Sequence, residues 1–153
     1  MNWFYSLSQT LTAAQISSLS QAFEAFLAQW KSHGTPITGN IALHYERFIH
    51  IYLAESRENP SGCSIDSMRH AVEKILISHE LTWAEAANVF FRDKNGAIQH
   101  TDFRQIPQLV SENTLTAETI VFDNSLSNTG LWEKWEVKMA DTWMRRYLTR
   151  IEH

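Results

Sequence analysis

Cysteine, proline and glycine are scarce in this sequence. Its 153 residues include one cysteine, three prolines and five glycines. The single Cys63 excludes an internal disulfide framework and favours a reducing compartment. The low glycine and proline content argues against long disordered linkers.

Targeting and membrane signals are also lacking. No segment approaches the roughly 20 apolar residues that a membrane-spanning helix needs. Residues 1–5 have neither the basic region nor the apolar length of a secretory signal peptide. A formal net charge of −4 argues against general nucleic-acid binding and against an anionic membrane surface, because both need clustered lysine and arginine. We therefore expect a cytoplasmic protein with neither of these partners.

The composition is that of an ordinary globular protein, and it predicts one α+β domain over residues 1–153. Hydrophobic residues make up 44% of the chain and aromatic residues 12%, enough for a sizeable core. Apolar spacing predicts helices over 12–32, 64–81 and 141–150 (the last capped by Asp141), a short helix from Asp102, and strands over 3–7, 88–92, 97–100, 119–123 and 135–139. Paired strands between helices indicate a mixed or mainly antiparallel sheet with three or four helices packed on it.

Residues 41–55 allow two interpretations. They form either two strands joined by a tight turn at Glu46 and Arg47, or one long bent strand. The turn length decides where two histidines lie. A three-residue turn would make His44 and His50 face each other, whereas a two-residue turn would put them on opposite faces of the sheet. None of the seven histidines has a chelating spacing, so we expect no metal and no cofactor.

The segment 60–67 is the first candidate site. A thiol at Cys63, beside a helix N-terminus, would have a lowered pKa, and free N–H groups near Ser61, Gly62 and Ser64 could hold an anion. The structural alternative is that Ser64 and Asp66 cap the helix while Cys63 packs as a small hydrophobic residue.

An enzyme at this segment would use Cys63 as nucleophile and Asp66 as its polar partner. Cys63 and Arg69 have the C-x5-R spacing of tyrosine phosphatases, but Asp66 inside that loop would repel phosphate. His70 lies seven residues after Cys63, about 10 Å along a helix, too far to serve as its base. The candidate bases that remain are His44, His50 and His100.

Aromatic residues gather near the end of the chain and form the second candidate site. Trp143 and Tyr147 are four residues apart and share a helix face. They could line a groove for a ligand, a protein partner or a second copy of the chain. The alternative is that they seal the core, because large aromatic side chains dominate protein cores.

Four segments, 45–48, 61–67, 120–124 and 135–143, carry a resemblance. The S-G-C-S-I-D element and its companions resemble a family of small uncharacterised bacterial proteins often labelled "ABC transporter ATPase". The resemblance implies a stand-alone cytoplasmic domain and marks Cys63, Asp66, Asp123 and Trp143 as residues of the family's motifs. A transporter ATPase needs a phosphate-binding lysine loop, and the sequence contains neither G-x-x-x-x-G-K-[ST] nor G-x-G-x-x-G.

Two classes of function follow from these sites. The first, which we favour, is a non-enzymatic module that binds a ligand or a protein partner, with the candidate residues Ser61, Gly62, Ser64, Asp123, Trp143 and Tyr147. The second is a small thiol-dependent enzyme that uses Cys63 and Asp66. An exposed Trp143–Tyr147 face would favour the module, and a cleft joining Cys63 to a histidine would favour the enzyme.

Overall fold

The computed structural model describes residues 2–32, 35–36, 39–53, 62–126 and 132–148. They form two compact units, the first ending at Ala84 and the second beginning at Glu85. Three α-helices and antiparallel sheets make up the fold, which confirms the α+β class. The single domain stays a prediction, because each unit has its own sheet and core. None of the described helices is long and apolar enough to cross a membrane.

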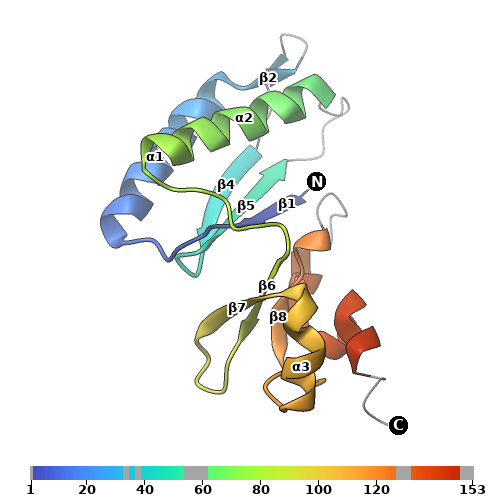
Figure 1. Cartoon of the computed structure of the whole chain (residues 1–153). Helices are drawn as coiled ribbons and strands as arrows, with labels where there is room; N and C mark the ends of the chain where they lie inside the picture. The colour runs from blue at the N-terminus through green and yellow to red at the C-terminus, as the bar shows by residue number, and fades with distance from the viewer. Residues whose placement is uncertain (1, 33–34, 37–38, 54–61, 127–131, 149–153) are drawn as a thin grey trace. The chain divides into compact units, whose positions relative to one another are not determined.

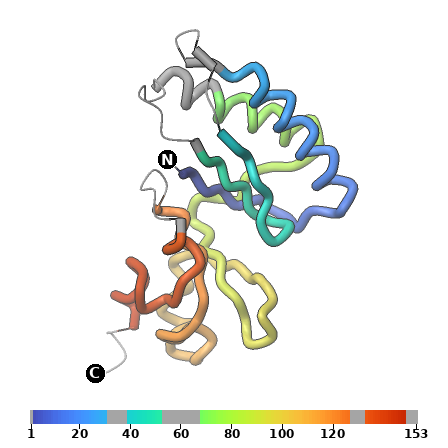
Figure 2. Tube along the Cα trace, turned by 180° about the vertical axis from the view of Figure 1, so that it is seen from behind, coloured from blue at the N-terminus to red at the C-terminus, as the bar shows by residue number. Residues whose placement is uncertain are grey.

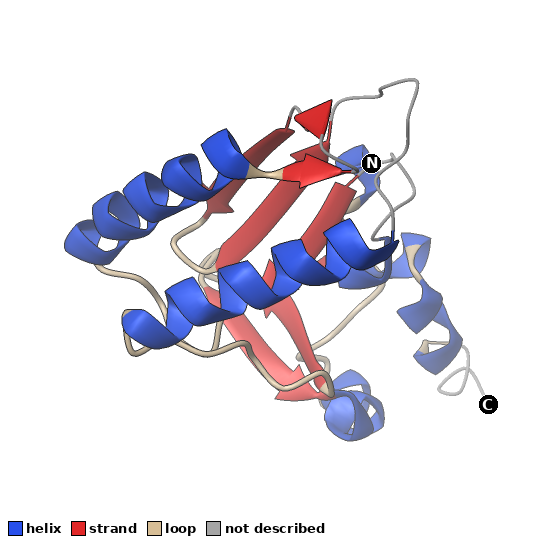
Figure 3. Ribbon diagram, turned by 90° about the horizontal axis from the view of Figure 1, so that it is seen from above, coloured by secondary structure: helices blue, strands red, loops and turns tan. Residues whose placement is uncertain are grey.

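The first unit packs two long helices on one face of a three-stranded sheet (Figures 1 and 3). The strands are β1 (Asn2–Ser6), β4 (Gly39–His44) and β5 (Phe48–Leu53), in the order β1-β5-β4 with both pairs antiparallel. The helices are α1 (Ala13–Gln29) and α2 (Gly62–Ser78). Side chains alternate along the strands, so Trp3, Tyr5, Ile49 and Ile51 face the helices.

Helix α1 begins as its sequence predicts and ends earlier. The Thr12 hydroxyl accepts the Gln15 backbone N–H at 3.2 Å, and the Gln15 side chain accepts the Thr12 N–H at 2.9 Å, which makes a capping box. Leu19 and Phe23 of its apolar stripe are buried in the core. The helix stops at Gln29, and the chain turns into a small ribbon of β2 (Lys31–Ser32) and β3 (Thr35–Pro36).

The turn between β4 and β5 has three residues, which corrects both the two-residue turn and the single bent strand. Register pairs His44 with Phe48, so Tyr45, Glu46 and Arg47 form the turn. Tyr45 and Glu46 have φ of 53° and 60°, a left-handed conformation that is unfavourable for side chains other than glycine. The neighbouring chain holds the turn in place. The Leu11 N–H donates to the Glu46 carbonyl at 2.7 Å, and the Leu7 N–H donates to the Arg47 carbonyl at 2.9 Å.

Helix α2 begins at Gly62, two residues before the predicted cap, so Ser64 lies inside the helix. It ends at Ser78, earlier than predicted, in a Schellman motif. The Leu81 N–H donates to the Leu76 carbonyl at 2.9 Å, and the Glu80 N–H donates to the Ile77 carbonyl at 3.0 Å. Glu80, with φ of 60°, occupies the left-handed position that usually belongs to glycine.

The second unit is built on a four-stranded antiparallel sheet. In Figure 2 its chain can be followed by colour from the yellow β6–β7 hairpin to the orange segment that contains β8. Its strands, in the order β7-β6-β8-β9, are β6 (Asn88–Arg92), β7 (Ile98–Asp102), β8 (Ile120–Phe122) and β9 (Glu136–Lys138). Helix α3 (Ile106–Ser111) covers one face. Buried Phe91, Val121, Ile106, Val110, Leu115, Met139 and Met144 form the core there.

The β6–β7 hairpin and the short helix after it lie close to where the sequence predicts them. Of Asn95 and Gly96 in the hairpin turn, only Gly96 has a positive φ, at 79°. Asp93 fixes the turn by accepting the Asn95 N–H at 2.8 Å and the Ala97 N–H at 3.0 Å. Asp102 then caps a 3₁₀ helix, η1 (Phe103–Gln105), that leads into α3.

A 3₁₀ helix, η5 (Trp143–Tyr147), takes the place of the predicted terminal α-helix in the described residues. Three more 3₁₀ helices precede it: η2 (Asn124–Leu126), η3 (Trp132–Lys134) and η4 (Met139–Asp141). Thr142 caps η5, and not Asp141 as predicted, since the Thr142 hydroxyl accepts the Met144 N–H at 3.1 Å. The same hydroxyl donates to the Met139 carbonyl at 2.9 Å, which locks the corner between η4 and η5.

Candidate ligand-binding site

Asp123 and Trp143, predicted from separate parts of the sequence, line one cavity of the second unit. Its volume is about 290 Å³. We call it the Asp123–Trp143 cavity, and its lining residues are Ala86, Asn88, Val89, Phe90, Phe122, Asp123, Asn124, Ser125, Trp143 and Met144.

The cavity lies at one end of the β6–β8 pair. These strands are antiparallel, with Phe90 opposite Phe122 and Phe91 opposite Val121. Strand β6 therefore begins where β8 ends, which brings Asn88 close to the residues that follow β8. Asp123 comes directly after β8, and its backbone N–H donates to the Trp135 carbonyl at 2.7 Å. Sheet pairing thus fixes the backbone that presents the carboxylate.

The Asp123 side chain is buried, with 6% of its surface exposed. One carboxylate oxygen, Oδ1, accepts the Ser125 backbone N–H at 3.1 Å and also the Ser125 hydroxyl. Among the described residues, neither a cation nor any donor to the second oxygen accompanies it. Among the described residues, every side-chain oxygen that is fully shielded from solvent has a hydrogen-bond partner. The second oxygen of Asp123 has no such partner, so solvent must reach it. It is a free acceptor in a residue that lines the cavity.

Aromatic rings form the apolar part of the wall. Phe90 and Phe122 are buried, while Trp143 is 39% exposed. Phe122 packs against Trp135 with ring centroids 5.1 Å apart. The Trp135 indole N–H donates to the Asn124 side-chain oxygen at 2.9 Å, which orients Asn124 on the cavity wall.

Trp143 and Tyr147 contact each other as the sequence predicts, although they lie on a 3₁₀ helix. Their rings meet edge to face with centroids 6.1 Å apart. The Arg146 guanidinium lies 5.3 Å from the Trp143 ring centre and 5.0 Å from that of Tyr147. Because Trp143 is exposed and Tyr147 only half-buried, these rings do not simply seal the core. Trp143 is the exposed member of this pair, while Tyr147 packs against the core of the unit.

The candidate site around Cys63 lies where the structure gives backbone only. Cys63 and Asp66 belong to the first turns of α2, which starts at Gly62. Ser61 and the side chains of residues 62–67, which include Ser64, lie outside the described residues. The thiol-dependent enzyme therefore stays a prediction.

His44 and His50 lie side by side, as a three-residue turn requires. His44 Nε2 is 3.4 Å from His50 Nδ1, and His50 Nε2 donates to the Asn2 side-chain oxygen at 2.7 Å. His50 also stacks on Phe4 with ring centroids 4.5 Å apart. Burial, and then the neighbouring His44, lower the pKa of His50 from 6.5 to about 4. The third candidate base, His100, packs on Phe90 with ring centroids 5.4 Å apart. Among the described residues, no three histidine, cysteine, aspartate or glutamate side chains are grouped to hold a metal ion.

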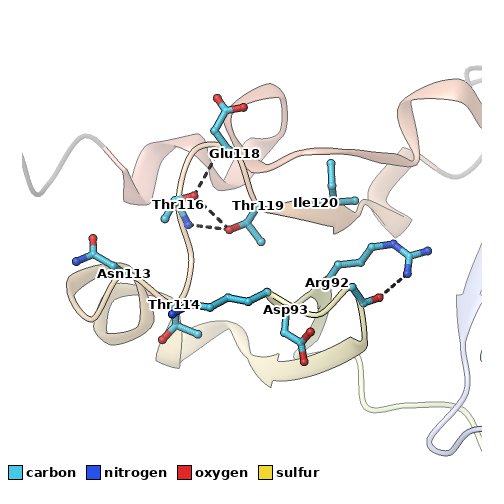
Figure 4. A pocket seen from close by; sticks show the side chains of 10 residues that line it. Arg92, Asp93, Asn113, Thr114, Thr116, Glu118, Thr119 and Ile120 are labelled. Atoms are coloured by element: carbon cyan, nitrogen blue, oxygen red, sulfur yellow. Dashed lines mark hydrogen bonds between the residues drawn. The ribbon is translucent and has the colours of Figure 1, made fainter.

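A second, larger hollow of about 470 Å³ lies around Arg92 and Thr116 (Figure 4). Two of its polar residues, Arg92 and Thr116, form hydrogen bonds within the fold. Arg92 donates to the Glu136 carboxylate at 2.9 Å and to the Gly96 carbonyl at 2.8 Å. The Thr116 N–H donates to the Thr119 hydroxyl at 2.9 Å. These groups already have partners within the fold, which makes this hollow a weaker candidate than the Asp123–Trp143 cavity.

Three polar residues of the cavity, Asn88, Asn124 and Ser125, were not predicted as site residues from the sequence. Ser125 holds the Asp123 carboxylate, and Asn88 opens β6 at the cavity wall. Asp123 followed by Asn124 and Ser125 is a readable signal for an Asx turn. The position of Asn88 depends on the pairing of β6 with β8, and local sequence does not reveal that pairing.

Comparison of the chain with protein-family models, curated proteins and solved structures finds no match. The resemblance to small bacterial proteins labelled as transporter ATPases therefore stays a prediction.

Proposed function

We propose that the protein is a binding module that takes up a small organic ligand in the Asp123–Trp143 cavity. The observation that carries this proposal is that a buried carboxylate, from Asp123, and an exposed indole, from Trp143, line the same cavity. Ligand sites are typically concave and mostly apolar, with a few polar groups that fix orientation. Phe90, Phe122 and Trp143 supply the apolar wall, and Asp123 with Asn88 supplies the polar groups.

The size of the cavity limits the ligand. About 290 Å³ is at the lower end of the ligand pockets found in proteins, which run from roughly 300 to 1,000 Å³. A single ring or a short branched chain fits such a volume, whereas a dinucleotide or a folded peptide does not. We further propose a cytoplasmic location, because a chain with one cysteine suits a reducing compartment.

The cavity supports binding rather than catalysis. Nucleophilic catalysis needs a nucleophile and a base within hydrogen-bond reach of each other. The polar groups that line the cavity are the carboxylate of Asp123, the amides of Asn88 and Asn124, and the hydroxyl of Ser125. The described lining residues include no histidine, cysteine or lysine. An Asp–Ser pair without an imidazole is a poor nucleophilic set, and it is a good acceptor for a ligand's polar group.

A fragment screen tests the proposal. Ligand-observed NMR would compare a library of single-ring fragments on the wild-type protein and on Ala86→Trp. Ala86 lines the cavity and is exposed, so a larger side chain there can fill the cavity without disturbing the core. We expect a set of fragments that bind the wild type and lose their signal on Ala86→Trp.

Ala14→Trp is the matched control, because Ala14 is an exposed residue of α1 in the other unit. It adds the same indole and should leave binding unchanged. Fragments that bind all three proteins equally would place binding outside the cavity and contradict the proposal.

A further inference from the structure

The Asp123 carboxylate, which carries the proposed function, also indicates what kind of ligand the cavity takes. Burial of a carboxylate is costly unless a cation or several hydrogen-bond donors compensate for it. Asp123 is 6% exposed, and its described partners are one backbone N–H and one hydroxyl, both from Ser125. Three ion pairs occur among the described residues, Arg92–Glu136, Arg104–Asp102 and Lys138–Glu118, and each leaves Asp123 out.

The free oxygen of this carboxylate accepts hydrogen bonds and does not donate them. A ligand placed against it must therefore bring an N–H or O–H donor, and a positively charged donor gives the strongest bond. An anionic ligand would be repelled by the same oxygen. The acceptor thus discriminates between ligands by charge.

The rings of the cavity favour the same charge. Trp143, Phe90 and Phe122 line the space beside Asp123. The face of an aromatic ring is electrically negative and attracts cations, most strongly for tryptophan. The ring of Trp143 already attracts the Arg146 guanidinium, 5.3 Å from its centre. The net charge of −4 further favours the approach of a cation.

We propose that the Asp123–Trp143 cavity is specific for a small organic cation, an ammonium-bearing molecule with a flat apolar body. The ammonium group donates to the free oxygen of Asp123, and the apolar body packs against Trp143 and Phe122. This inference rests on the proposed function, because it names the ligand class of the same cavity.

Three probes of one shape test the charge requirement: benzylammonium, benzyl alcohol and benzoate. Isothermal titration calorimetry on the wild-type protein should show benzylammonium binding about tenfold or more tightly than benzyl alcohol, as a charge-assisted hydrogen bond predicts. Benzoate should bind most weakly. This comparison uses only the wild-type protein, so it does not depend on how any variant folds.

The variant Asp123→Asn removes the charge and keeps a side-chain oxygen that can accept from Ser125. Its affinity for benzylammonium should fall to that for benzyl alcohol. Asp141→Asn is the matched control, since Asp141 is an exposed acidic residue of the same unit that does not line the cavity. It should keep the preference for the cation.

Equal or tighter binding of benzyl alcohol or benzoate would overturn the ligand class, and so would unchanged benzylammonium binding by Asp123→Asn. The absence of binding by all three probes would overturn it as well. The fragment screen distinguishes these failures from a failure of the proposed function. If neutral or anionic fragments bind the wild type and not Ala86→Trp, the cavity still binds ligands and only the ligand class is wrong.

Discussion

Asp123 uses its two carboxylate oxygens differently. Oδ1 closes a local turn with Ser125, while the other oxygen has no described partner and remains for a ligand. Asp93, in contrast, bonds through both of its oxygens, with Asn95, Ala97 and Gln99 in its hairpin turn. This contrast between two aspartates of the same unit separates a structural carboxylate from a candidate binding group.

Thr12 shows how one residue determines where a helix begins. Thr12→Ala removes the hydroxyl that accepts the Gln15 N–H, and we expect a loss of about 1 kcal/mol of unfolding free energy. Ser17→Ala, at an exposed position inside α1, is the control and should be neutral or slightly stabilising, because alanine is the better helix former. Urea unfolding measures both. Equal stability of the two variants would contradict a role for the capping box.

His50 predicts a pH dependence. Its pKa is about 4 in the folded protein and near 6.5 in the unfolded chain, because burial and His44 disfavour the charged imidazole. Between these values the unfolded chain binds more protons, so the contribution to stability is complete above pH 6.5 and is lost as the pH falls toward about 4. The urea midpoint of the wild type should therefore fall more steeply across this range than that of His50→Gln.

An NMR titration tests the same prediction directly. The imidazole of His50 should remain neutral until the pH approaches about 4. A midpoint for His50 near the ordinary 6.5 would contradict the burial argument.

The elements that the sequence predicted best are those whose ends are marked by capping or turn residues. The capping box at Thr12 located the start of α1, and strand β6 has the bounds predicted for it, Asn88–Arg92. The predicted C-terminal end of α2 and the predicted length of the β4–β5 turn were wrong for the same reason. Both place glutamate in a left-handed conformation where glycine or asparagine is expected, so no signal marked them. Tertiary hydrogen bonds, such as that from Leu11 to Glu46, hold the β4–β5 turn instead.

The Schellman motif at the end of α2 gives a prediction for that element. Glu80→Gly relieves a left-handed residue at φ of 60° and should stabilise the protein by about 0.5–1 kcal/mol, because glycine adopts this conformation without a steric penalty. Glu24→Gly is the control, at an exposed position inside α1, where glycine should cost about 1 kcal/mol. Opposite signs in urea unfolding are expected. Destabilisation by both substitutions would show that the Glu80 side chain stabilises the motif.

In the molecule as a whole, the sequence predicted the fold class and most of the element order, but it did not predict two units. Local periodicity reveals helices and strands and does not reveal which strands pair. The division of the strands between the sheets β1-β5-β4 and β7-β6-β8-β9 depends on such pairing.

The candidate site has the same limitation. Asp123 was singled out from the resemblance and Trp143 also from its spacing to Tyr147. The cavity that joins them exists because β6 pairs with β8, although β7 and α3 separate these strands in the sequence. Asn88 belongs to it for the same reason. Residues 60–67, the other predicted site, were singled out from a local pattern and from the resemblance, and the Cys63 hypothesis stays a prediction.

The central claim is that the Asp123–Trp143 cavity is where the protein binds its ligand, and mapping of a bound probe on the protein tests it most directly. Titration of ¹⁵N-labelled wild-type protein with benzylammonium should shift the signals of the Asn88 and Ser125 backbone amides and of the Trp143 indole, assigned with Trp143→Phe. Signals from α1, in the other unit, should stay in place. Shifts that saturate with benzylammonium but leave Asn88, Ser125 and Trp143 unchanged would contradict the account.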